Sequence, residues 1–312
     1  MATTFAQDVA GTMSLYKQSS KAMQVQEHNL LSGLPQDHEV MVFSGFKKLQ
    51  RAAKFVLDKL NANGQSGNQF IVVLDLPEDA RAKLANDKDV LGGIDFRFQF
   101  DETTGVIKVP SAEHDETTEN LKDEIRDASL AMGVPKPQMT WGMSTTHKGT
   151  HSKKGKQPDQ CFWPAPRHPT AVQPRGWPTL VIETGVTESL PKLREDVLWW
   201  FLNSNGDVRI VLVLSISTKR RTALLEKWQL APANTPQPMT RATLPMPPLV
   251  QQMPTAQQPY AHQEIQLTQT TMTGGPLVLP FEALFCRPPQ GTETDITLTQ
   301  QELLPIIRLI GL

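Results

Sequence analysis

One stretch of the chain, residues 177–217, constrains the fold more than any other. It begins with an apolar run that ends in a carboxylate, Glu183, and a glycine break follows. Apolar residues then recur with helical spacing over residues 190–202, and an Asn-Gly pair ends the pattern. Residues 209–217 are almost continuously apolar and β-branched. Two apolar strands joined by one amphipathic helix predict a βαβ unit, with parallel neighbouring strands and the helix packed on one face.

Glu183 points to chemistry when it is considered together with a second acid. A carboxylate at the end of an apolar strand costs free energy unless something partners it, and the plainer interpretation is a side chain that faces water. Asp159 lies 24 positions earlier, at the start of another polar-to-apolar stretch. Two acids at the ends of neighbouring strands suit a hard cation such as Mg²⁺, which prefers oxygen ligands. The sequence therefore predicts Asp159 and Glu183 as ligands of a magnesium ion that would polarise a phosphoryl oxygen and generate hydroxide.

The spacing of these acids carries a resemblance to a known fold. Pro158-Asp159, followed by Glu183-Thr184-Gly185 at the end of an apolar strand, resembles the PD-(D/E)XK nuclease fold. More narrowly, residues 181–200 resemble a family of uncharacterised fungal proteins that carry this fold and share an E-x-G-x-[ST]-E-S motif, then a helix with L-x-x-D and Trp. The matching residues here are Glu183, Gly185, Thr187, Glu188, Ser189, Leu193, Asp196, Trp199 and Trp200. The resemblance covers about residues 115–230 and implies an activity on nucleic acid phosphodiesters.

The chain departs from the nuclease pattern at one position. The lysine that the family places two residues after the glutamate is replaced by Gly185. Such a lysine would orient the attacking water and stabilise developing negative charge. Lys156, shortly before the predicted metal ligands, and Lys192 or Arg194 on the following helix are the candidates to replace it.

The order of the predicted elements agrees with the same fold. A helix over 116–132 and a short strand over 139–143 precede the two acid-bearing strands, the second helix and the last strand. This αβββαβ order, with a mixed sheet, is the restriction-endonuclease-like core that the resemblance implies. In that fold the first helix often contributes an acid, and Glu124 is the choice here, with Glu119 and His114 as alternatives.

The predicted fold class is α+β to α/β, with an N-terminal α+β extension beside the core. The chain has 312 residues, and its patterns divide it into five parts. These are a loose N-terminus over 1–37, the extension over 38–110, the nuclease-like core over 111–230, a poorly ordered Pro/Gln-rich linker or insertion over 231–262, and a C-terminal strand and helix over 263–312 that complete the core.

A basic segment lies between the predicted strands, at residues 147–156. It holds four lysines, two histidines and no acid. As a mobile loop it could reach a phosphate backbone, and the alternative is a polar loop that is only solvated. Zinc binding by His147 and His151 is disfavoured because companion ligands are missing. Base stacking by Trp163 or Trp177, near the predicted site, is a further hypothesis.

Composition sets limits on partners and location. The chain has 31 Lys and Arg against 32 Asp and Glu, so net charge gives no global attraction to nucleic acid. Cys161 and Cys286 are isolated, which excludes a CxxC zinc site and a disulfide framework and suits a reducing compartment. No apolar stretch reaches transmembrane length, and the N-terminus lacks a secretory signal. We expect an intracellular protein, cytoplasmic or nuclear, that does not associate with membranes.

Two functions stay open at this point. The first is a metal-dependent nuclease that cleaves phosphodiesters with magnesium on Asp159 and Glu183. The second is a catalytically inactive nuclease-fold module that binds nucleic acid or a protein partner. The acid pair and the basic segment favour the first, whereas the missing lysine favours the second, so whether the chain is an enzyme is undecided. A hydrolase of another class would need a nucleophile motif such as GxSxG, which the sequence lacks.

Overall fold

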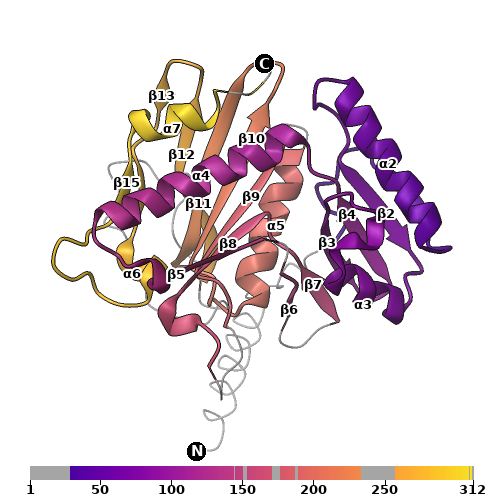
Figure 1. The fold of residues 1–312 in the computed structure, drawn as a ribbon, viewed down its shortest axis with the longest axis horizontal. Coiled ribbons are helices and arrows are strands. Elements are labelled where there is room, and N and C mark those ends of the chain that lie inside the picture. Colours follow the sequence, from indigo (N-terminus) through magenta and orange to yellow (C-terminus); the bar gives the residue numbers. More distant parts are fainter. Residues whose placement is uncertain are drawn as a thin grey trace, which may run out of the picture.

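The computed structural model describes residues 29–143, 145–149, 153–170, 176–186, 189–232, 257–308 and 310. These residues form a mixed α+β protein with a seven-stranded, a six-stranded and a two-stranded sheet. The two larger sheets lie side by side, each with its own helices (Figure 1). None of the described helices has the length and apolar character needed to cross a bilayer.

The core of the seven-stranded sheet follows the predicted αβββαβ order. Its elements are α4 (Ala112–Ala131), β5 (Met139–Gly142), β8 (Gln160–Pro164), β9 (Leu180–Val186), α5 (Leu190–Asn203) and β10 (Ile210–Ser217). Strand β8 is antiparallel to both β5 and β9, whereas β9 and β10 are parallel, with Glu183 opposite Val213. The predicted parallel pair and the restriction-endonuclease-like core are therefore confirmed.

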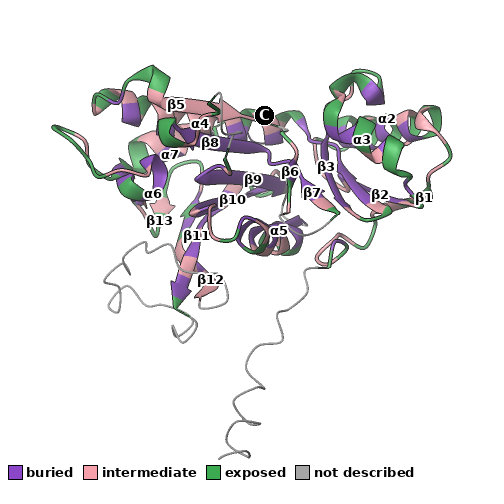
Figure 2. Ribbon diagram, turned by 90° about the horizontal axis from the view of Figure 1, so that it is seen from below, coloured by how far each residue is buried: buried purple, intermediate pink, exposed green. Residues whose placement is uncertain are grey.

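The two helices of this core cover opposite faces of the sheet (Figure 2). Val181 of β9 packs in one apolar cluster with Leu193 of α5. Its neighbour Ile182 packs in another cluster with Leu121 of α4. Successive side chains of a strand point to opposite faces, so a continuously apolar strand such as β9 is buried on both. This burial explains why the apolar run of β9 is not interrupted until Glu183.

The N-terminal extension builds most of the six-stranded sheet. Its elements are β1 (Glu39–Val42), α2 (Phe46–Ala62), β2 (Phe70–Leu74), α3 (Glu78–Asn86), the 3-10 helix η1 (Lys88–Leu91), β3 (Arg97–Asp101) and β4 (Thr104–Lys108). Helices α2 and α3 cover one face, where Phe98 and Phe100 of β3 pack with Leu49 and Leu84. The alternate residues of β3, Arg97 and Gln99, consequently point to the other face.

The basic segment between β5 and β8 corrects the sequence-based prediction of an irregular loop. Residues 147–148 form β6 (His147–Lys148) and residues 154–156 form β7 (Lys154–Lys156), which pair as antiparallel strands. Strand β7 also pairs with β3, so the hairpin extends the six-stranded sheet of the N-terminal extension. The edge of β3 offers unpaired backbone groups, and pairing with β7 satisfies them. Residues 150–152, which include His151, lie outside the described residues.

The predicted linker over 231–262 is strand at both of its ends. Strand β11 (Thr222–Pro232) continues into it, and β12 (Gln257–Leu267) begins within it. The two strands are antiparallel, and Tyr260 of β12 is buried. Pairing between these strands provides the hydrogen bonds and burial that the polar sequence alone does not reveal. Residues 233–256, the middle of the predicted linker, lie outside the described residues.

The C-terminal elements pack on the core. They are β13 (Met272–Thr273), β14 (Leu277–Leu279), α6 (Phe281–Phe285), β15 (Ile296–Leu298) and α7 (Gln300–Ile306), and short 3-10 helices occur at η2 (Lys136–Gln138) and η3 (Ala165–Arg167). Apolar residues of β14, α6 and α7 share one buried cluster with α4 and β9. Thr299 and Glu302 form a capping box that begins α7.

Candidate functional site

The two predicted acids lie at the same end of neighbouring strands. In the antiparallel pair of β8 and β9, Gln160 is opposite Ile182. One further step along this register places Asp159 across from Glu183, and directly opposite residues share a face of a sheet. Both side chains are buried, with residue exposures of 1% each. The structure therefore brings Asp159 and Glu183 together in the interior of the protein.

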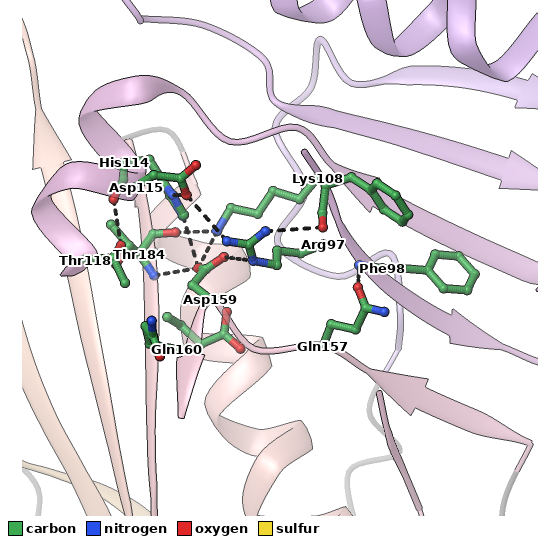
Figure 3. A network of polar contacts seen from close by, with 12 residues as sticks. Arg97, Phe98, Lys108, His114, Asp115, Thr118, Gln157, Asp159, Gln160 and Thr184 are labelled. Atoms are coloured by element: carbon green, nitrogen blue, oxygen red, sulfur yellow. Dashed lines mark hydrogen bonds and ion pairs between the residues drawn. The ribbon is translucent and has the colours of Figure 1, made fainter. Parts of the chain in front are cut away.

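Asp159 is surrounded by donors from four elements or loops (Figure 3). Its Oδ2 accepts hydrogen bonds from Lys108 Nζ at 2.7 Å and from the Thr184 backbone N–H at 2.8 Å. His114 Nε2 lies 3.1 Å from the same oxygen, and Arg97 Nε lies 3.6 Å from Oδ1. Burial alone would raise the pKa of this carboxyl, but Lys108, His114 and Arg97 outweigh it and hold the pKa of Asp159 well below its usual range. Asp159 is thus an ionised carboxylate with its charge compensated inside the protein.

The two cations beside Asp159 come from the N-terminal extension. Arg97 begins β3, Lys108 ends β4, and the two residues are directly opposite in the antiparallel pair. Lys108 Nζ also donates to the Thr184 backbone oxygen. Neither residue was predicted from the sequence as part of the site. The signal that existed was local: Arg97 and Gln99 alternate with three phenylalanines, which shows that one face of β3 is polar.

A second set of ion pairs surrounds Glu183. Its Oε1 accepts a hydrogen bond from Trp200 Nε1 at 2.7 Å and lies 3.4 Å from Lys156 Nζ. Lys156 Nζ is also 3.0 Å from Asp196 Oδ2, and Asp196 Oδ1 accepts a hydrogen bond from Lys192. The structure thus brings both predicted lysines into this network, Lys156 on Glu183 and Lys192 on Asp196. Arg194, the alternative, instead pairs with Glu226.

The side chains of this second set influence one another's protonation. Burial raises the pKa of Glu183 to about 7, with Asp159 and Asp196 adding to the rise and Lys156 opposing it. Burial alone would lower the pKa of Lys156, but Asp196 and Glu183 raise it above its usual value. For Asp196, burial is outweighed by Lys156 and then Lys192, so its pKa is lowered. Glu183 is therefore the carboxyl of the cluster that titrates near neutral pH.

Gly185 stands where the nuclease pattern has lysine, and the packing explains the glycine. A Cβ at this position would lie 2.1 Å from Ser189 Oγ and 3.3 Å from a methyl carbon of Leu193. A side chain at position 185 would clash with Ser189, the residue that begins α5. The E-x-G and serine features of the motif are thus coupled by packing. The remaining motif positions, Thr187 and Glu188, lie outside the described residues.

Helix α4 contributes His114 to the cluster. Thr118, one turn later, donates a hydrogen bond to Thr184 Oγ1 at 2.7 Å, and Glu119 accepts one from Gln160. Glu124, the first choice from sequence, is half-buried farther along the helix, where burial and then Glu302 raise its pKa. The structure does not bring Glu124 into the Asp159 cluster, and the charged groups that act on it are other acids on α4 and α7.

The side chains around Asp159 and Glu183 do not fit the predicted magnesium ion as they are arranged. Four buried cations face three buried acids there, namely Arg97, Lys108, Lys156 and Lys192 against Asp159, Glu183 and Asp196. Mg²⁺ requires about six oxygen ligands at about 2.1 Å, but the nearest cation already lies 2.7 Å from the Asp159 oxygen. Among the residues that the structure describes, no group of three or more His, Cys, Asp or Glu side chains is placed to hold a metal. Magnesium binding stays a prediction.

The tryptophans near the site pack in the interior. His147 of β6 stacks on Trp163 and Trp177, with ring centroids 5.7 Å and 5.2 Å apart. Its ring makes a T-shaped contact with Trp200, with centroids 5.4 Å apart. Trp163 is fully buried and Trp177 is partly buried. This aromatic cluster joins the β6–β7 hairpin to the core. Base stacking on Trp163 would require a ring face that the protein already covers.

Comparison with known proteins adds little to what the topology shows. No protein-family model and no curated protein matches the chain. Among solved structures, a candidate nuclease belonging to DUF820 from Anabaena variabilis is similar, with 10% identity, a TM-score of 0.37, and coverage of 67% of this chain and 90% of that one. By its own element order and strand pairing, the chain is an α+β protein with a restriction-endonuclease-like core. The narrower resemblance to fungal proteins stays a prediction.

Proposed function

We propose that this protein is a nuclease-fold module that binds nucleic acid without magnesium-dependent cleavage. The observation that carries the proposal is the environment of Asp159. One oxygen of this carboxylate has Lys108 Nζ, the Thr184 backbone N–H and His114 Nε2 at 2.7, 2.8 and 3.1 Å. A metal ion at this oxygen would have to displace Lys108 from a buried position.

The energetics of burial favour a structural role for the acid pair. A carboxylate removed from water is stabilised only by close partners, and removing one partner of a buried pair typically costs about 3–5 kcal/mol. Asp159 and Glu183 are each 1% exposed and each has cationic neighbours. In this role Asp159 holds β3 and β4 of the extension against β8 and β9 of the core. The extension thereby covers the strand ends at which a nuclease of this fold would act.

Nucleic acid is the partner that the surface chemistry favours. Two lysines of the β6–β7 hairpin, Lys148 and Lys153, are exposed, and neither forms an ion pair with another described residue. Basic side chains on a hairpin that projects from a sheet contact phosphates without reading sequence. The proposed binding is therefore electrostatic and salt-dependent.

A second candidate, metal-dependent phosphodiester hydrolysis, is favoured by one contact. Lys156 Nζ lies 3.4 Å from Glu183 Oε1, so an acid pair and a lysine are assembled although Gly185 occupies the usual lysine position. In that case Lys108 and Arg97 would have to leave Asp159, which requires the extension to move away from the core. Magnesium held by Asp159 and Glu183 would then supply Lewis-acid chemistry at a phosphoryl oxygen.

The experiment that separates these functions measures binding and cleavage on the same samples. Purified protein is mixed with end-labelled single- and double-stranded DNA and RNA, in Mg²⁺, in Mn²⁺ and in EDTA. We expect bound complexes in all three conditions and no cleavage above the EDTA level. Cleavage that depends on metal and is lost in Asp159→Asn would contradict the proposal and support the second candidate. Absence of any complex at low salt would contradict nucleic-acid binding itself.

A further inference from the structure

A separate basic pocket lies on the other face of the six-stranded sheet. It has a volume of about 250 Å³ and is lined by residues of α3, β3 and the β6–β7 hairpin. Phe100 of β3 forms part of its wall, and Phe100 points away from the face that carries Arg97 and Gln99. The pocket is therefore distinct from the Asp159 cluster.

Arg81 of α3 is held in place at this pocket. Its side chain is 13% exposed, and its guanidinium lies 5.3 Å from the centroid of the Phe100 ring. Arg81 Nη1 donates to the Glu102 backbone oxygen, and Nη2 lies 3.7 Å from Glu78 Oε1. The Glu78 side chain is 90% exposed, and such an exposed pair contributes little to stability. The guanidinium is thus pre-oriented, and its ion-pair partner is an exposed carboxylate.

Three lysines of the hairpin complete the lining. Lys154 pairs with Asp101 at 2.9 Å, whereas Lys148 and Lys153 are exposed and form no ion pair within the described part of the chain. Hydrogen bonding within the hairpin holds the backbone from which these lysines project, because Gly149 N–H donates to the Lys154 oxygen at 3.2 Å. Four cations line the pocket, and Glu78 and Asp101 pair with two of them, so Lys148 and Lys153 supply the excess positive charge.

We propose that this pocket binds the terminal phosphate of a nucleic-acid strand. A planar guanidinium presents paired N–H donors to phosphate oxygens, and lysines add point charge. A terminal phosphate carries about −1.5 to −2 charge at neutral pH, which suits the cation excess better than the single charge of a backbone diester. The volume of about 250 Å³ is large enough for a phosphate group. This inference rests on the proposed function for its ligand, although the phosphate chemistry of the pocket stands separately.

The test compares strands that differ only at their ends. Fluorescence anisotropy in EDTA would measure the affinity of the full chain for one oligonucleotide with a 5′-phosphate, a 3′-phosphate or hydroxyl ends. We expect at least fivefold tighter binding for one of the phosphorylated forms. Arg81→Gln and the double variant Lys148→Gln/Lys153→Gln should each remove most of that preference. The matched control is Lys47→Gln/Lys48→Gln, which deletes the same charge from exposed positions on α2 and should keep the preference.

The outcomes separate the ligand sources and the two proposals. Equal affinity for phosphate and hydroxyl ends, or a preference that Arg81→Gln leaves intact, would overturn the pocket assignment. Arg81→Lys keeps the charge but lacks the paired donors. It is the control that separates loss of the phosphate contact in Arg81→Gln from loss of folding. Inorganic phosphate that binds as tightly as the phosphorylated strand, measured by calorimetry and lost in Arg81→Gln, would keep the phosphate site and assign it to a small ligand. Binding of inorganic phosphate without binding of any strand would contradict nucleic-acid binding, but it would support the pocket as a phosphate site.

Discussion

Lys108 Nζ lies 2.7 Å from Asp159 Oδ2, and this contact links the last residue of β4 in the extension to the acid that precedes β8 in the core. Both side chains are buried, so the pair is shielded from the solvent screening that weakens surface ion pairs. The contact couples the position of the extension to the chemistry of the core. Lys108 and Arg97, two of the groups that balance the charge of Asp159, stay beside it only while the two sheets remain together.

The first prediction concerns the stability of this contact. Lys108→Met should lower the free energy of unfolding by about 3–5 kcal/mol, because it leaves a buried carboxylate without its nearest cation. Urea denaturation followed by tryptophan fluorescence would measure the change. Lys54→Met is the matched control, since Lys54 pairs with Asp58 at 2.9 Å on an exposed helix face, and its loss should cost less than about 1 kcal/mol. Equal costs for the two variants would show that the buried pair contributes no more than a surface pair.

The second prediction concerns pH and Glu183. Its pKa rises in the folded protein from the ordinary 4.5 to about 7. Between these values the folded chain keeps a proton that the unfolded chain releases, so the free energy of unfolding falls as pH rises through this range. Glu183→Gln removes the titration. The quantity to compare is the free energy of unfolding of the variant minus that of the parent protein. This difference should be larger at pH 8 than at pH 5 by roughly 1–3 kcal/mol.

Denaturation curves of the parent and Glu183→Gln at both pH values provide the measurement. The amide oxygen of Gln can still accept the hydrogen bond from Trp200 Nε1, and Lys156 keeps Asp196 as its partner. A difference of opposite sign, with the variant losing stability at pH 8, would show that Glu183 acts as an ionised partner of Lys156.

The third prediction concerns the glycine at the nuclease lysine position. Gly185→Ala should destabilise the fold by about 1–3 kcal/mol, because overpacking forces neighbours to shift. The neighbour is Ser189 Oγ, 2.1 Å from the added Cβ. Adding Ser189→Gly should restore part of the loss, since the two sites are in contact and their effects are not additive. Gly176→Ala is the control, with the nearest atom at 3.7 Å, and a loss of equal size there would contradict this explanation.

The sequence predicted the core well because its elements have strong local patterns. The apolar run before Glu183 and the helical spacing through Leu193 and Trp200 each permit few structures, and strand order then places Asp159 beside Glu183. The hairpin was missed because Lys154-Gly155-Lys156 has no apolar alternation. Its strand conformation comes from pairing with β3, which is a tertiary effect.

The cations that the extension contributes to the cluster could not be predicted either, because tertiary contacts bring them there. Arg97 and Lys108 are separated from Asp159 by 62 and 51 positions, and nothing in their local patterns shows which surface they face. Alternation in β3 indicates a polar face, but only the contact between the two sheets shows that this face covers two carboxylates. Lys156 was a candidate from its position near Asp159, yet its pairing with Asp196 depends on the placement of α5.

The last prediction tests whether the extension alone prevents metal binding. In the double variant Arg97→Gln/Lys108→Gln, Asp159 keeps His114 and Glu183 keeps Lys156 as close basic neighbours. The negative charge that Arg97 and Lys108 balance in the parent protein becomes available to Mg²⁺. Thermal unfolding with increasing Mg²⁺ should raise the Tm of this variant, because a ligand that binds only the folded state stabilises it. The parent protein should show no such rise. Lys47→Gln/Lys48→Gln removes the same charge from exposed positions on α2 and should behave like the parent. An equal Mg²⁺-dependent rise in the parent would show that the ion displaces Lys108 unaided, and the acid pair would then be a metal site as the sequence first indicated.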